Sequence, residues 1–85
     1  MFSSNREIYH FVGTIIEKLD EIQEKQWSSA FRNALSISSV EGEILGETWL
    51  TLKSFQKTEF PERFNIKNEV VEAIKVVGKA LGNLS

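Results

Sequence analysis

Apolar residues recur at helical spacing in the first quarter of the chain. They follow one another at intervals of four, three, four and three residues, in a stripe made of Ile8, Val12, Ile15, Leu19 and Ile22. This rhythm is typical of a helix packed against a neighbour, and Phe11 and Ile16 widen the stripe beyond that of a two-stranded coiled coil. Ser4 and Glu7 have the spacing of a capping box, so we expect the first helix to begin there.

After Ile22 the apolar stripe rotates by about 100° on ideal helical geometry. The new stripe consists of Trp27, Ala30, Phe31, Ala34 and Leu35. Because one straight helix cannot bury both stripes in one place, the pattern predicts a turn or kink near residues 23–26 and a short second helix over residues 25–35. The serine-rich residues 36–39 predict the next boundary, since serine favours helix caps over helix interiors.

A third, central helix is predicted over residues 38–55, opened by a second capping box at Ser38 and Glu41. Its broad apolar face is expected to contain Val40, Ile44, Leu45, Thr48, Leu52 and Phe55. The opposite face contains Glu43, Glu47 and Leu50. Leu50 is therefore out of phase with the core, and folding alone does not explain it.

The only proline, Pro61, disfavours helical backbone at Phe60 and predicts a turn within residues 56–64, which Phe60 and Phe64 would anchor to the core. Asn65 is expected to cap a last helix that ends in a left-handed cap at Gly82 and Asn83. The apolar face of this helix comprises Ile66, Val70, Ala73, Ile74, Val77, Ala80 and Leu81. Together these patterns predict an all-α fold, a compact antiparallel bundle of about four helices in a single domain over residues 1–85.

The composition fits a small globular domain, with 85 residues, 41% of them hydrophobic and 26% charged. The net charge of −2 argues against a general nucleic-acid binder. The absence of cysteine excludes disulfides, thiolate metal sites and cysteine nucleophiles. No apolar run approaches the roughly 20 residues of a membrane span, and residues 1–14 lack the features of a signal peptide, so we expect a soluble cytoplasmic protein.

Catalytic and metal-binding patterns are sparse. Glu7 and His10 have the spacing of two metal ligands on one helical turn, but the chain has no second histidine, so we expect no metal and no cofactor. Glu43 and Glu47 lie one turn apart on an outward face, where carboxylates are normally solvated rather than catalytic. The sequence has no phosphate-binding loop and no dinucleotide fingerprint. We therefore expect a protein that is not an enzyme.

Acidic clusters give the leading functional hypothesis, a module that binds a basic partner protein. One candidate surface consists of Glu17, Asp20, Glu21 and Glu24, and the other of Glu43, Glu47, Trp49 and Leu50. An alternative is a structural homodimer in which Leu50 and the glycine pairs Gly42/Gly46 and Gly78/Gly82 pack against a second copy. A second alternative is a weak nucleic-acid binder that uses Lys53, Lys57, Arg63 and Lys67, which lie among phenylalanines.

The middle of the chain resembles small uncharacterised bacterial helical domains, some of them immunity partners of secreted toxins. The residues that carry this resemblance are Leu19, Glu24, Trp27, Phe31, Ala34 and Leu35, followed by the run from Val40 to Leu45. In size, acidity and helical class the chain is also similar to the colicin nuclease immunity proteins, four-helix domains that block a basic toxin. It has only Tyr9 in place of their adjacent tyrosine pair, so none of their binding residues is carried over. The resemblance implies a bacterial immunity or regulatory protein.

Overall fold

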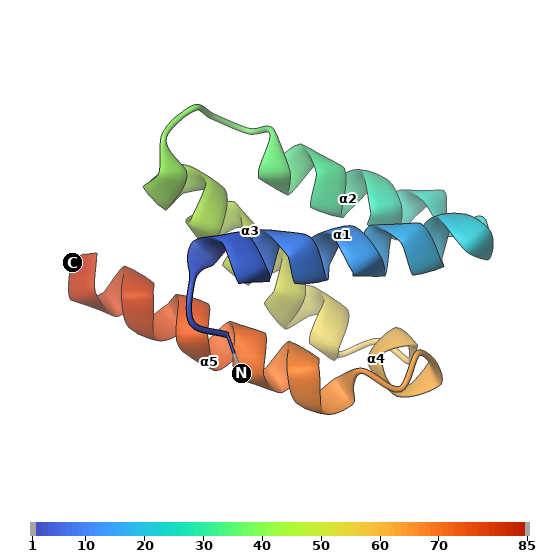
Figure 1. Cartoon of the computed structure of the whole chain (residues 1–85). Helices are drawn as coiled ribbons and strands as arrows, with labels where there is room; N and C mark the ends of the chain where they lie inside the picture. The colour runs from blue at the N-terminus through green and yellow to red at the C-terminus, as the bar shows by residue number, and fades with distance from the viewer. Residues whose placement is uncertain (1, 85) are drawn as a thin grey trace.

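Five helices make up the part of the chain that the computed structural model describes, residues 2–84, with side chains described for residues 2–82 (Figure 1). They are α1 (Asn5–Glu21), α2 (Lys25–Leu35), α3 (Glu41–Gln56), α4 (Phe60–Arg63) and α5 (Lys67–Leu84). No strand occurs among these residues. The all-α prediction is therefore confirmed, with four long helices and one single-turn helix, α4.

The central position belongs to α3, which packs against α2, α4 and α5, while α1 packs chiefly on α2 and crosses in front of α3 (Figure 1). The radius of gyration is 12.0 Å. A folded chain of this length is expected to have a value of about 12 Å. The prediction that the chain is organised around this helix is confirmed.

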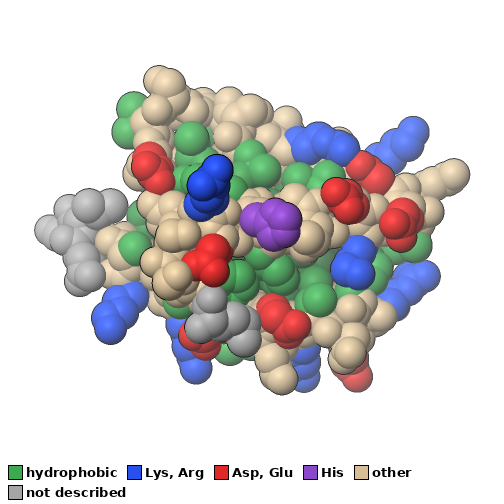
Figure 2. Space-filling model, viewed as in Figure 1, with side chains coloured by type: hydrophobic (Ala, Val, Ile, Leu, Met, Phe, Trp, Pro, Cys, Tyr) green, Lys and Arg blue, Asp and Glu red, His purple; other side chains and the backbone are tan. Residues whose placement is uncertain are grey.

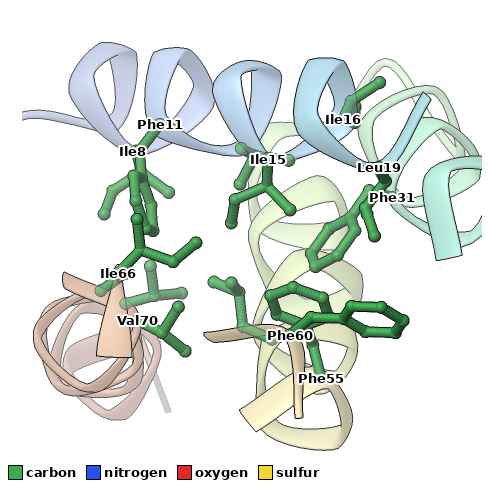
Figure 3. Close-up of a cluster of buried hydrophobic side chains, with 14 of the residues drawn as sticks. Ile8, Phe11, Ile15, Ile16, Leu19, Phe31, Phe55, Phe60, Ile66 and Val70 are labelled. Carbon is green, nitrogen blue, oxygen red and sulfur yellow. The ribbon is translucent and has the colours of Figure 1, made fainter. Parts of the chain in front are cut away.

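One hydrophobic core joins all five helices. From α1, Ile8 and Phe11 point towards Ile66 and Val70 at the start of α5 (Figure 3). Phe55 of α3 lies at the centre of a row of aromatic rings, with ring centroids 5.1 Å from Phe31 and 6.1 Å from Phe60. These aromatic contacts connect α2, α3 and α4. Each such pair of rings stabilises the fold by about 0.5–1.5 kcal/mol beyond the burial of its surface.

The turn between α1 and α2 forms without glycine or proline. Gln23 adopts a left-handed conformation with φ of 61°. The Gln23 N–H donates to the Asp20 carbonyl at 3.0 Å, and the Glu24 N–H donates to the Leu19 carbonyl at 2.9 Å. This pair of bonds is a Schellman motif, which ends a helix and reverses the chain. The predicted turn near residues 23–26 and the second helix over residues 25–35 are both confirmed.

The first capping box forms only in half. Ser4 Oγ accepts a hydrogen bond from the Glu7 N–H at 3.3 Å, as expected for the N-cap of α1. The Glu7 carboxylate, however, accepts from the backbone N–H and hydroxyl of Ser3 instead of returning to Ser4. These bonds lower the pKa of Glu7 below its usual value of 4.5.

The capping box predicted at Ser38 and Glu41 is wrong, because α3 begins at Glu41. Ser38 Oγ accepts from the Val40 N–H at 2.9 Å and donates to the Glu43 carboxylate at 2.8 Å. The Glu41 carboxylate is already engaged by Asn5 and Tyr9 of α1. Val40 consequently stays in extended backbone and is 56% exposed, so its predicted place on the core face is also wrong.

The predicted limits of the last helix need two corrections. Asn65 does not cap α5; it has φ of 58° and ends α4 in a second Schellman motif, with the Ile66 N–H donating to the Pro61 carbonyl at 2.8 Å. Pro61 lies in the first turn of α4, where its missing N–H costs nothing. At the other end α5 continues to Leu84, and no described glycine has positive φ, so the left-handed cap at Gly82 is absent.

Candidate protein-binding groove

The acidic cluster at the end of α1 is partly occupied by an ion pair. Asp20 pairs with Arg32 of α2, and this guanidinium holds the pKa of the Asp20 carboxyl below its usual value of 3.8. Glu17 and Glu21 are exposed, and Glu24 is the residue that precedes α2. The acidic residues here therefore include one that fastens two helices of the same chain together.

The two predicted acidic surfaces do not join. The end of α1 and the beginning of α3 lie at opposite ends of the bundle (Figure 1). On the face that carries His10, acidic side chains alternate with lysines and arginines (Figure 2). A partner that contacts one acidic group would have to extend along the whole molecule to reach the other.

The second predicted surface coincides with a groove of about 430 Å³ on the outer side of α3. We call it the α3 groove and define it by its lining residues Ile37, Glu43, Gly46, Glu47, Trp49, Leu50 and Leu81. All four residues predicted for this surface line the groove. The structure adds Ile37 from the loop before α3, Gly46 from α3 itself and Leu81 from α5.

Gly46 forms an open gap in the groove. A Cβ atom placed on Gly46 would have no neighbour within 4 Å. Glu43, Gly46, Glu47 and Leu50 follow one another at intervals of three, one and three residues, so they outline a diamond on one face of α3. Four residues in this arrangement form the hole that receives a side chain from another helix in knobs-into-holes packing.

Trp49 forms a fixed wall of the groove. Its indole N–H donates to the Ile74 carbonyl of α5 at 3.1 Å. A Cβ atom on Gly78 would lie 3.0 Å from the Trp49 Nε1 atom, so a larger residue there would crowd the ring. Among Gly42, Gly46 and Gly78, a Cβ atom added at Gly78 would meet the Trp49 side chain, and one added at Gly42 or Gly46 would meet no other part of the chain within 4 Å. Close approach of two helix backbones through these glycine pairs stays a prediction.

The apolar side chains of the groove are unusually exposed. Leu50 is 53% exposed and Ile37 is 54% exposed. The expected outward position of Leu50 is thus confirmed, and Ile37 joins it from a separate segment. Two large aliphatic side chains and a partly buried tryptophan thus line one solvent-open groove, whereas single exposed aliphatic residues are common.

Charges of opposite sign lie at the two ends of the groove. Glu43 and Glu47 are exposed in the first half of α3, and Glu43, in the first turn, also complements the helix dipole. At the other end, the Lys53 ammonium lies over the Trp49 ring, 4.4 Å from the ring centroid. The groove is therefore acidic at one end, apolar in the middle and basic at its C-terminal edge.

A second hollow, of about 490 Å³, lies along α1. It is lined by Phe2, Arg6, Glu7, His10, Phe11, Thr14 and Glu69. Its apolar part is formed by Phe2 and Phe11, whose ring centroids are 5.2 Å apart. These two rings contact each other at a tilt, and the charged residues that line the hollow are of mixed sign, so they do not favour one class of ligand.

The basic residues near Pro61 lack free aromatic rings. Phe55 and Phe60 are buried, and Phe64 stacks on Phe60 with centroids 5.7 Å apart. Base stacking on Phe55 or Phe60 would require opening the core, and Phe64 is only partly exposed. Within residues 2–82 no group of three or more acidic or histidine side chains is placed to hold a metal, and no described helix has the length and apolarity of a membrane span.

Two residues of the groove were not predicted from the sequence. Ile37 is a single aliphatic residue within the serine-rich linker, and its isolation was the only available signal. Leu81 fits the helical period of the core face, so nothing in the sequence distinguishes it from a core residue. No protein-family model, curated protein or solved structure matches this chain.

Proposed function

We propose that this chain is a protein-binding module that receives a helix of its partner in the α3 groove. The observation that carries the proposal is the half-exposed Leu50 beside the open gap at Gly46. Burying a leucine side chain is favourable by about 1.5–3 kcal/mol. Leu50 cannot obtain this energy within its own fold, because it faces away from the core.

The charges around the gap define the chemistry of the partner. Glu43 and Glu47 lie on two corners of the diamond, so a helix inserted there is favoured when it carries lysine or arginine opposite them. The partner segment is thus a helix with one aliphatic side chain that enters the gap and basic residues one turn further along. A bacterial immunity or regulatory role would use such a contact, and we keep that role as our hypothesis for the biological setting.

A defined peptide tests this function. The probe is a helix-stabilised peptide with one leucine and with lysines three and four residues after it; the control peptide has glutamines in place of the lysines. In isothermal titration calorimetry we expect the lysine peptide to bind at least about tenfold more tightly than the glutamine peptide, and less tightly as salt is added.

Variants of the chain locate the binding. Leu50→Ser should weaken binding of the lysine peptide about tenfold or more, because it removes the central apolar contact. Ile22→Ser is the matched control, since Ile22 is 37% exposed but lies at the end of α1. Equal affinity for both peptides, or an equal loss in both variants, would contradict the proposal.

A further inference from the structure

We infer that the helix received by the α3 groove is α3 of a second copy of this chain, antiparallel to the first, with Leu50 of each copy seated over Gly46 of the other. The inference rests on the proposed function, because it names the occupant of the same groove. The occupant needs an exposed aliphatic side chain followed by a basic residue. This chain itself carries both groups on α3.

The first argument is that one face of α3 contains both halves of the contact. Leu50 is the exposed aliphatic side chain, and Gly46, one turn before it, is the open gap. A pair related by a two-fold axis repeats each contact, so a surface that carries a projection and a matching gap side by side is self-complementary. The glycine also allows the two helices to approach closely.

The second argument is the position of the charges. In an antiparallel pair, moving forward along one helix corresponds to moving backward along the other. When Leu50 lies over Gly46 of the second copy, Lys53, three residues after Leu50, lies opposite Glu43 of the second copy, three residues before Gly46. On ideal geometry Lys53 and Glu43 lie about 40° on either side of the line that faces the partner. The symmetry produces this Lys53–Glu43 contact twice.

The structure already places Lys53 for this role. Its ammonium lies over Trp49, which is itself a wall of the groove, and Trp49 is fixed by its hydrogen bond to α5. Glu43 is oriented by the hydroxyl of Ser38, which donates to its carboxylate. Both charged side chains are exposed and lie beside the apolar centre, where opposite charges fix the register of a helix pair.

The third argument is that the flanking elements extend the contact. Ile37 from the loop before α3 and Leu81 from α5 are lining residues of the same groove. The second helix would cover both of them together with Leu50. Because only one helix pair and its margins take part, the interface is at the small end of protein interfaces, and we expect a dissociation constant on the order of micromolar.

Sedimentation velocity across a range of protein concentrations tests the inference. The wild-type chain should shift from monomer to dimer as its concentration rises, and added salt should weaken the dimer. Lys53→Glu and Glu43→Lys should each weaken dimerisation at least about tenfold, because each change introduces two like-charge contacts into the symmetric pair. The double variant Lys53→Glu/Glu43→Lys exchanges the charges and should restore the dimer.

Two further variants test the register. Lys25→Glu is the matched charge control: Lys25 is exposed at the start of α2 and does not line the groove, so its reversal should leave the dimer unchanged. Gly46→Leu fills the gap and should weaken the dimer, whereas the monomer should stay folded, since a Cβ atom added there meets no other part of the chain within 4 Å and leucine favours a helix more than glycine does. Circular dichroism of every variant verifies the fold.

The outcomes separate this inference from the proposed function. If the chain stays monomeric at every concentration but binds the lysine peptide, the occupant of the groove is not a second copy. The proposal that the groove binds a partner helix then still stands. A dimer that is insensitive to Lys53→Glu, or that the double variant fails to restore, overturns the stated register. If neither the dimer nor the peptide complex forms, both proposals are wrong.

Discussion

At the scale of single residues, the turn between α1 and α2 and the turn between α4 and α5 each depend on a left-handed residue that is not glycine. Gln23 and Asn65 have φ values of 61° and 58°. Asparagine tolerates this conformation better than most residues, whereas an ordinary side chain such as glutamine costs about 1–2 kcal/mol there. The bonds of the Schellman motif and the core packing of α1 and α2 offset this cost.

Gln23→Gly should stabilise the protein by about 0.5–1 kcal/mol, because glycine adopts positive φ without steric cost and loses only part of this gain to the greater freedom of the unfolded chain. Urea unfolding followed by circular dichroism measures the change. Gln26→Gly, in the first turn of α2, is the control and should destabilise by about 1 kcal/mol. The prediction fails if both variants are destabilised equally.

Thr48 of α3 places a hydroxyl group in the hydrophobic core of the protein. The side chain is fully buried, and its Oγ1 atom has no hydrogen-bond partner among the described residues. Thr48→Val removes this hydroxyl with little change of shape and should raise the free energy of unfolding by about 1 kcal/mol. Thr51→Val is the control: Thr51 Oγ1 donates to the Glu47 carbonyl at 2.8 Å, so no comparable gain is expected. Chemical denaturation of the three proteins checks this.

At the scale of elements, the beginning of α3 is fixed by contacts that short sequence patterns do not contain. The spacing of Ser38 and Glu41 is that of a capping box, but Glu41 is bound by Asn5 and Tyr9, which are 36 and 32 residues away in sequence. The limits of α2, in contrast, were predictable, because the rotation of the apolar stripe after Ile22 is a local signal. Local patterns therefore located the four long helices, whereas the beginning of α3 also depends on long-range contacts.

Ser38→Ala should destabilise the protein by about 1 kcal/mol, because the variant loses the bond from the Val40 N–H and the bond to Glu43. The neighbouring exposed residue supplies the control, since Ser39→Ala removes a hydroxyl without these bonds. Thermal unfolding of both variants measures the difference. A similar melting temperature for the two would show that the Ser38 contacts contribute nothing to α3.

The ion pair between α1 and α2 should make stability dependent on pH. Because Arg32 lowers the pKa of Asp20 in the folded state, the pair stabilises the protein above the unfolded value near 3.8, and this contribution is lost as pH falls through the lower folded pKa. The stability difference between wild type and Asp20→Asn should therefore be largest near neutral pH and vanish in acid. Urea titrations at several pH values, with Glu17→Gln as the control, measure it.

At the scale of the whole molecule, the sequence could predict about half of the groove. Leu50, Glu43 and Glu47 were identifiable because their outward position depends only on the period of α3. Ile37 and Leu81 reach the groove through the loop before α3 and through the packing of α5 on α3, which a linear pattern does not specify. The all-α class was predictable for the same reason as the outward position of Leu50. Both follow from the helical spacing of apolar residues within single segments of the sequence.

The order in which the helices pack also has a consequence for the speed of folding. The main contacts join successive helices, apart from the packing of α5 on α3 across the single turn of α4. Chains dominated by such local contacts fold in microseconds to milliseconds, so we expect stopped-flow refolding at low concentration to be complete within milliseconds. Any association of two copies would follow as a slower, concentration-dependent phase, and each chain would meet its partner with α3 already formed.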